Sequence, residues 1–153
     1  TERGYSFRMK EDIEADMKDK MCYVAMDFDK ELEIANDNPE SIEKKYELPD
    51  GQYITMGSER FRTAEIMFKP ELIGMECNGV HRQIFSSITK CDVDIRGELW
   101  GNIIITGGNT LFDGFDERLK KELVGLAPES INVNIVEVDD RRTITNIETH
   151  AFW

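Results

Sequence analysis

A short run of β-branched residues that ends in two glycines constrains the fold of this 153-residue chain more than any other feature. The run, Asn102 to Thr106, contains three consecutive isoleucines and stops at Gly107-Gly108, which predicts a strand buried on both faces and hence a parallel sheet. Apolar residues at helical spacing follow over 113–125, with Gly125 as the expected C-cap, and residues 131–136 alternate as a half-buried strand does. Together they predict a right-handed βαβ unit and the α/β fold class.

The N-terminal half is predicted to contain one long helix and a β-hairpin. Apolar side chains recur at spacings of three and four from about Lys10 to Ala35, which is typical of an amphipathic helix, with Tyr23 as the candidate position of a break. Asn and Asp residues followed by a proline favour a turn that ends this helix. Two short runs around Pro49-Asp50-Gly51, residues 44–48 and 52–56, predict the hairpin.

Short helices are expected in the middle of the chain. Residues 59–72 have a mixed pattern that indicates short helical turns, and residues 81–90 place three apolar side chains on one side of a helix. A second short helix is expected to end near Trp100. The stretch 72–80 has two glycines and little polar character, so we expect a boundary between two lobes there.

The charge balance excludes several classes of partner. Asp and Glu exceed Lys and Arg by 31 to 19, a net charge of −12, and a field of this sign repels phosphate backbones and anionic lipids. Nucleic acid and membrane surfaces are therefore not expected as direct partners, and the longest apolar run is far too short to span a membrane. Three widely spaced cysteines favour a reducing compartment, the cytosol or the nucleus. Because the chain begins with Thr1, we expect it to be a processed or excised piece of a longer product.

The turn after the isoleucine run is the main candidate binding site. Residues 106–110 lie where a strand gives way to a helix, the place at which open α/β sheets bind ligands, and glycine lets the backbone approach a phosphate or a base. The turn lacks the spacing of a dinucleotide-binding or P-loop motif, so a plain tight turn is the alternative. We interpret His81 as structural because no second His or Cys stands at ligand spacing, and we interpret Asp92 and Asp94 as a strand-like corner.

Seven blocks of the sequence resemble the actin family in both order and spacing. They extend from Thr1 to about Arg142, with a two-residue shortening near residues 8–10. The blocks are TERGYSF (1–7), MCYVA (21–25), YELPDGQ (46–52), ERFR (59–62), LIGME (72–76), KCDVDIR (90–96) and LAP (126–128). Seven collinear blocks leave little room for chance.

The resemblance implies part of an actin-like ATPase domain. Residues 1–75 resemble the family's inserted α/β outer lobe, and residues 76–142 resemble part of its ribonuclease H-like inner lobe. Residues 143–153 diverge, as a frameshift, an altered splice or a divergent paralogue would produce. The family binds ATP or ADP with Mg²⁺ or Ca²⁺ between two domains, polymerises head to tail and hydrolyses ATP slowly in the filament. The resemblance thus implies a cytoplasmic, cytoskeletal protein whose partners are its own copies, intact actin and actin-binding proteins.

The resemblance also names a nucleotide site, position by position. Lys18 and Asp19 match the pair that faces the adenine and the ribose, with Asp19 where the family usually has Glu. The strip that lies against the nucleotide matches Gly107, Gly108, Asn109, Leu111 and Phe112, of which Asn109 and Leu111 replace the usual Thr and Met. Arg142 falls where a Lys reaches the adenine, and Ala15 replaces an Arg that approaches the nucleotide.

The resemblance leaves three functions open. The first is nucleotide-dependent filament formation, which is favoured because residues 49–51, 68–80 and 92–95 resemble surfaces through which actin subunits contact one another. The second is an actin-related scaffold subunit of a chromatin-modifying or motor-adaptor complex, and the third is a non-catalytic fragment that perturbs actin assembly. The family's phosphate loops would precede Thr1, so this chain alone is expected to be inactive as an ATPase.

Overall fold

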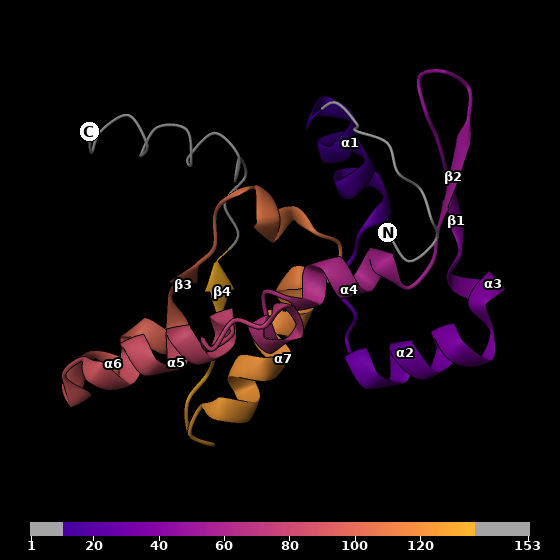
Figure 1. Cartoon of the computed structure of the whole chain (residues 1–153). Coiled ribbons are helices and arrows are strands. Elements are labelled where there is room, and N and C mark those ends of the chain that lie inside the picture. Colours follow the sequence, from indigo (N-terminus) through magenta and orange to yellow (C-terminus); the bar gives the residue numbers. More distant parts are fainter. Residues whose placement is uncertain (1–10, 137–153) are drawn as a thin grey trace.

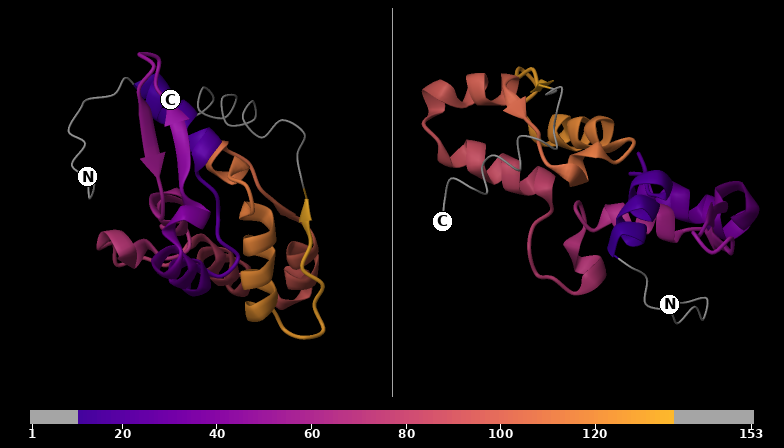
Figure 2. Two further views of the ribbon diagram at one scale, coloured as in Figure 1. Left: turned by 90° about the vertical axis from the view of Figure 1, so that its right-hand side faces the viewer. Right: turned by 90° about the horizontal axis from the view of Figure 1, so that it is seen from above.

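The computed structural model describes residues 11–136 of the chain and has a mixed helix and strand fold of the α/β class (Figure 1). The elements in chain order are α1 (Glu11–Met21), α2 (Phe28–Asp37), α3 (Pro39–Ile42), β1 (Lys44–Glu47), β2 (Tyr53–Met56), α4 (Glu59–Glu65), the 3₁₀ helix η1 (Pro70–Ile73), α5 (Val80–Lys90), α6 (Val93–Gly101), β3 (Ile103–Ile104), the 3₁₀ helix η2 (Gly108–Leu111), α7 (Phe115–Leu126) and β4 (Ile135–Val136). The hairpin and α1 to α3 lie on one side, and β3, β4 and α5 to α7 lie on the other, with α4 between them (Figures 1 and 2). Within residues 11–136, no helix has the length and apolar character needed to cross a membrane.

The strand-helix-strand order is confirmed, but the strands are shorter than predicted, since only residues 103–104 and 135–136 pair, and the predicted burial of the first strand on both faces is wrong. β3 and β4 pair in parallel, with Ile103 opposite Ile135, and α7 lies between them in the chain. Ile103 and Ile105 are buried, whereas Ile104 is 64% exposed. The expectation that both faces are covered was therefore wrong, because successive side chains of a strand point to opposite faces and the core lies against only one of them.

The long N-terminal helix is two helices, so the prediction of one continuous element was wrong and that of a break near Tyr23 was right. Residues 22–27 separate α1 from α2, and three of them, Cys22, Val24 and Ala25, are buried. The backbone N–H of Tyr23 donates to the Arg60 carbonyl at 3.2 Å, and that of Val24 donates to the Asp113 carbonyl at 2.8 Å. Asp27 then caps α2 by accepting from the Lys30 N–H. The extended backbone here donates hydrogen bonds to carbonyl groups of two neighbouring segments. A continuous helix would use these N–H groups internally and leave the two carbonyls without these partners.

The hairpin is confirmed, and two details of the helices differ from expectation. β1 and β2 pair antiparallel around a turn in which Gly51 has φ of +81°. Gly125 lies inside α7 rather than capping it, and Ala127 is the C-cap, because the Ala127 N–H still donates to the Leu123 carbonyl at 2.8 Å and so continues the helical bonding past Gly125. Asp92 is the N-cap of α6, its side chain accepting from the Asp94 N–H, so the strand-like corner was also wrong.

Two clusters of buried apolar side chains form the core, and α4 contributes to both. Phe61 belongs to the smaller cluster, with Phe28 of α2 and Ile42 of α3. Ala64 belongs to the larger one, which packs against β3 and α7. The last residue of α4, Glu65, then reaches a buried ion pair with Arg118 of α7. One short helix therefore joins the two sides of the molecule.

His81 in α5 has a buried ring nitrogen without a hydrogen-bond partner among the described residues. Its ring stacks on Phe68 with centroids 5.9 Å apart, and its Nδ1 is the atom left without a partner. Burial lowers the pKa of His81 below its ordinary value of 6.5. As the pH falls, His81 is therefore protonated at a higher pH in the unfolded chain than in the folded chain.

We expect the free energy of unfolding to fall as the pH decreases from about 7.5 to about 5.5, the window around the ordinary histidine pKa. The contribution of His81 is complete above its unfolded pKa and is lost as the pH falls toward the lower folded pKa. Urea unfolding at three pH values measures this, with His81→Phe as the matched variant because it keeps an aromatic ring on Phe68. Parallel pH profiles for the two chains would contradict the prediction.

Candidate functional site

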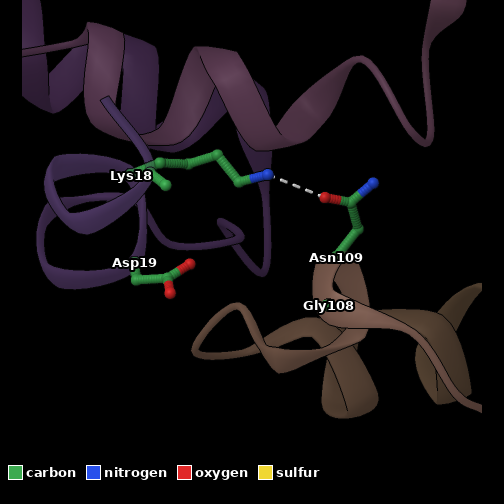
Figure 3. Close-up of a pocket in the computed structure, with 5 residues that line it drawn as sticks. Lys18, Asp19, Gly108 and Asn109 are labelled. Atoms are coloured by element: carbon green, nitrogen blue, oxygen red, sulfur yellow. Dashed lines mark hydrogen bonds between the residues drawn. The ribbon is translucent and has the colours of Figure 1, made fainter. Parts of the chain in front are cut away.

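A pocket of about 270 Å³ lies between the second half of α1 and the η2 turn (Figure 3). It is lined by Ala15, Lys18, Asp19, Gly108 and Asn109. The Lys18 ammonium donates to the Asn109 Oδ1 atom at 2.9 Å across the pocket, and the same Nζ atom lies 5.3 Å from the centre of the Phe112 ring. The site thus joins two segments that are distant in the sequence.

Local structure explains how each wall is built. Positions 15, 18 and 19 fall on one face of α1 because residues three and four apart are neighbours on a helix. On the other wall, Gly107 has φ of +98°, a conformation that favours glycine, and the Thr110 hydroxyl donates to the Gly107 carbonyl at 2.8 Å. A Cβ atom at Gly108 would meet nothing within 4 Å. The turn therefore presents open backbone to the pocket.

Both walls are fastened to the rest of the molecule. The Asp16 carboxylate accepts from the Lys20 ammonium at 2.8 Å and from the Tyr46 hydroxyl at 2.6 Å, which ties α1 to β1, and these two bonds lower the pKa of Asp16. The chain after α1 pairs with the segment after η2 through a bridge between Tyr23 and Asp113. The α1 wall of the pocket is therefore bonded to the hairpin, and the chain that follows each wall is paired with the chain that follows the other.

The charges of the lining residues balance. Lys18 supplies one positive charge and Asp19 one negative charge, while Ala15, Gly108 and Asn109 are neutral. Among residues 11–136, no three His, Cys, Asp or Glu side chains gather closely enough to hold a metal ion. The lining side chains also offer no nucleophile with a neighbouring base. The lining thus offers one ammonium donor, one carboxylate acceptor and an amide group to a polar ligand.

Ala15 lines this pocket together with four of the nucleotide-facing residues that the resemblance implies: Lys18, Asp19, Gly108 and Asn109. Gly107 begins the turn as the residue before η2, and Phe112 follows it with its ring beside Lys18. Leu111, the last residue of η2, is exposed and does not line the pocket. Arg142 lies outside the described residues.

Sequence reasoning missed the contact between Lys18 and Asn109. No periodicity or motif links two positions so far apart, and only the folded chain brings them within 2.9 Å. It also missed the pairing of Glu65 with Arg118, although the i,i+4 spacing of Arg118 and Glu122 was a visible signal for one ion pair on α7.

A family model described as Actin matches residues 1–147 of the chain. The matched range includes both segments that line the pocket and every element of the described fold.

Proposed function

Because this chain belongs to the actin family, we propose that it binds the nucleoside part of ATP or ADP in the pocket between α1 and η2. One observation carries the proposal: Lys18, Asp19, Gly108 and Asn109, which the family resemblance names as nucleotide-facing, line a single pocket. Its volume of about 270 Å³ is just below the range typical of small-molecule sites, which suits a nucleoside better than a whole nucleotide.

Three of the lining residues have a defined role in this proposal. Lys18 donates a hydrogen bond to an acceptor on the base, and the Asp19 carboxylate accepts from a ribose hydroxyl. Gly108 lets the ligand approach the backbone, because the space that a side chain would fill is open. The cation that accompanies the nucleotide in the family, Mg²⁺ or Ca²⁺, does not fit the described residues, since none of their acidic side chains form a metal-holding group. The proposal therefore has no step that depends on a metal.

The wider setting of the proposal follows the family. The chain would be a segment of a cytoplasmic, filament-forming protein, with residues 1–75 in the inserted outer lobe, residues 76–142 in the ribonuclease H-like inner lobe and residues 143–153 as a divergent tail. Exposed apolar side chains at Leu72, Ile73, Met75, Val93 and Ile95 support contacts with other subunits. Co-sedimentation with intact actin tests this setting. Incorporation supports assembly, no contact would favour the scaffold alternative, and capping or inhibition would favour the assembly-perturbing fragment.

We expect adenosine, ADP and ATP to bind with affinities that agree within about threefold, which is less than 1 kcal/mol. The charges of Lys18 and Asp19 cancel, and the chain carries a net charge of −12, so added phosphates gain no attraction. Isothermal titration with each ligand, with and without Mg²⁺, measures this. Binding of ATP at least tenfold tighter than that of adenosine would contradict the prediction.

Gly108→Val is the matched variant for this titration. The Cβ of a valine there would enter open space rather than meet the protein, so ligand affinity should be lost with little change in the unfolding curve. Gly125→Val is the control, because a Cβ at Gly125 also meets nothing within 4 Å and Gly125 does not line the pocket. Equal affinities for Gly108→Val and the unchanged chain would mean that the ligand binds elsewhere.

A further inference from the structure

We propose that Asn109 is a positioning residue: its side-chain oxygen holds the Lys18 ammonium across the pocket before any ligand arrives. This inference rests on the proposed function, since it concerns the same pocket. In this inference Asn109 changes ligand affinity by orienting Lys18, and it does not contact the ligand itself.

The chemistry of the two groups fixes the direction of the contact. A lysine ammonium only donates, so the Asn109 carbonyl oxygen must face Lys18 and the amide NH₂ group must point away from it (Figure 3). The bond is 2.9 Å long, and the Phe112 ring lies 5.3 Å from the same nitrogen. One of the three ammonium hydrogens is therefore engaged by Asn109, and among residues 11–136 no other hydrogen bond occupies the remaining two.

The benefit of such a contact is conformational. A lysine side chain has four rotatable bonds and loses much freedom when it is ordered. If Asn109 orders Lys18 in the free protein, that loss does not count against ligand binding, which is the general effect of preorganisation. Lys18 and Asn109 come from α1 and η2, so the bond also fixes the width of the pocket between its two walls. Removing the amide should weaken binding even if the ligand never touches Asn109.

A double-mutant cycle tests the proposal, with adenosine as the probe and calorimetry as the measurement. We expect Asn109→Ala to weaken adenosine binding roughly threefold to tenfold, the range of one net hydrogen bond. In the Lys18→Met background, the same substitution should change affinity less than about twofold, because the group that Asn109 positions is already gone. Asn102→Ala is the matched control: it removes an exposed asparagine whose amide donates to the Glu98 carbonyl, remote from the pocket lining.

A spectroscopic signature separates positioning from a general effect on the fold. The NMR signal of the Lys18 ammonium, assigned by its loss in Lys18→Met, should be detectable in the unchanged chain and should broaden in Asn109→Ala, since hydrogen bonding slows proton exchange. The unfolding curves of the two chains should coincide.

The possible results are distinguishable. Adenosine binding that is equal in the unchanged chain and in Asn109→Ala overturns the proposal and leaves the proposed function intact. An Asn109→Ala effect of the same size with and without Lys18 also overturns it, because Asn109 would then contact the ligand itself. Absence of adenosine binding by the unchanged chain refutes the proposed function and this inference with it.

Discussion

Replacing Arg118 by methionine is expected to lower the free energy of unfolding by about 3–5 kcal/mol, the cost of leaving one buried charge without its partner. The Arg118 side chain is 5% exposed and the Glu65 side chain 0%. Two guanidinium N–H groups donate to the two oxygens of Glu65 at 3.0 Å each, and the same Arg118 donates to the Ala25 carbonyl and, at 2.7 Å, to Glu122. Burial, with a smaller contribution from the Glu122 charge, raises the pKa of Glu65, and the hydrogen bonds and charge of Arg118 oppose this rise, so the carboxylate depends on Arg118 to stay charged.

Urea unfolding with a matched pair of variants measures this effect. Lys120→Met, on the exposed side of the same helix, is the control and should change stability by less than about 0.5 kcal/mol. The double variant Glu65→Leu with Arg118→Met should regain part of the loss, because two apolar residues replace the pair without leaving a charge. If Arg118→Met were as stable as Lys120→Met, the ion pair would not link α4 to α7.

Local sequence patterns predicted the elements well and their burial less well. The isoleucine run, the helix after it and the alternating stretch 131–136 predicted a strand-helix-strand unit, which β3, α7 and β4 confirm. The exposure of Ile104 was missed because three identical apolar residues in a row carry no alternation. Likewise, the helical spacing of apolar residues from Lys10 to Ala35 continued across the gap between α1 and α2. Val24 and Ala25 in this gap are buried, but they lie in extended backbone and not on the face of a helix.

The candidate site came from resemblance to a family rather than from local patterns. The pattern around 106–110 indicated a binding turn with a plain turn as its alternative, and nothing in the sequence of α1 pointed to a ligand. Position-by-position resemblance brought Lys18 and Asp19 to the same site as Gly108 and Asn109, and all four line one pocket. Resemblance could not predict the bond from Lys18 to Asn109, because a contact between side chains depends on the distance between α1 and η2 in the folded chain.

Two glycine-to-alanine substitutions should change stability in opposite directions. Gly79 precedes α5, and a Cβ atom there would lie 2.0 Å from the backbone oxygen of Phe68. This oxygen cannot turn away, because the Val80 N–H donates to the neighbouring Met67 carbonyl at 2.9 Å and holds the two segments together. Gly79→Ala should therefore force α5 away from the end of α4 and lower the free energy of unfolding by about 3 kcal/mol or more, the upper range for overpacking.

Gly97→Ala is the matched control for Gly79→Ala, because Gly97 lies inside α6 and its Cβ would meet nothing within 4 Å. Alanine restricts the unfolded backbone and favours helix, so this variant should be more stable than the unchanged chain by about 0.5–1 kcal/mol. Thermal and urea unfolding of the three chains measure both effects. A Gly79→Ala chain as stable as Gly97→Ala would mean that α5 has room to shift away from the Phe68 backbone.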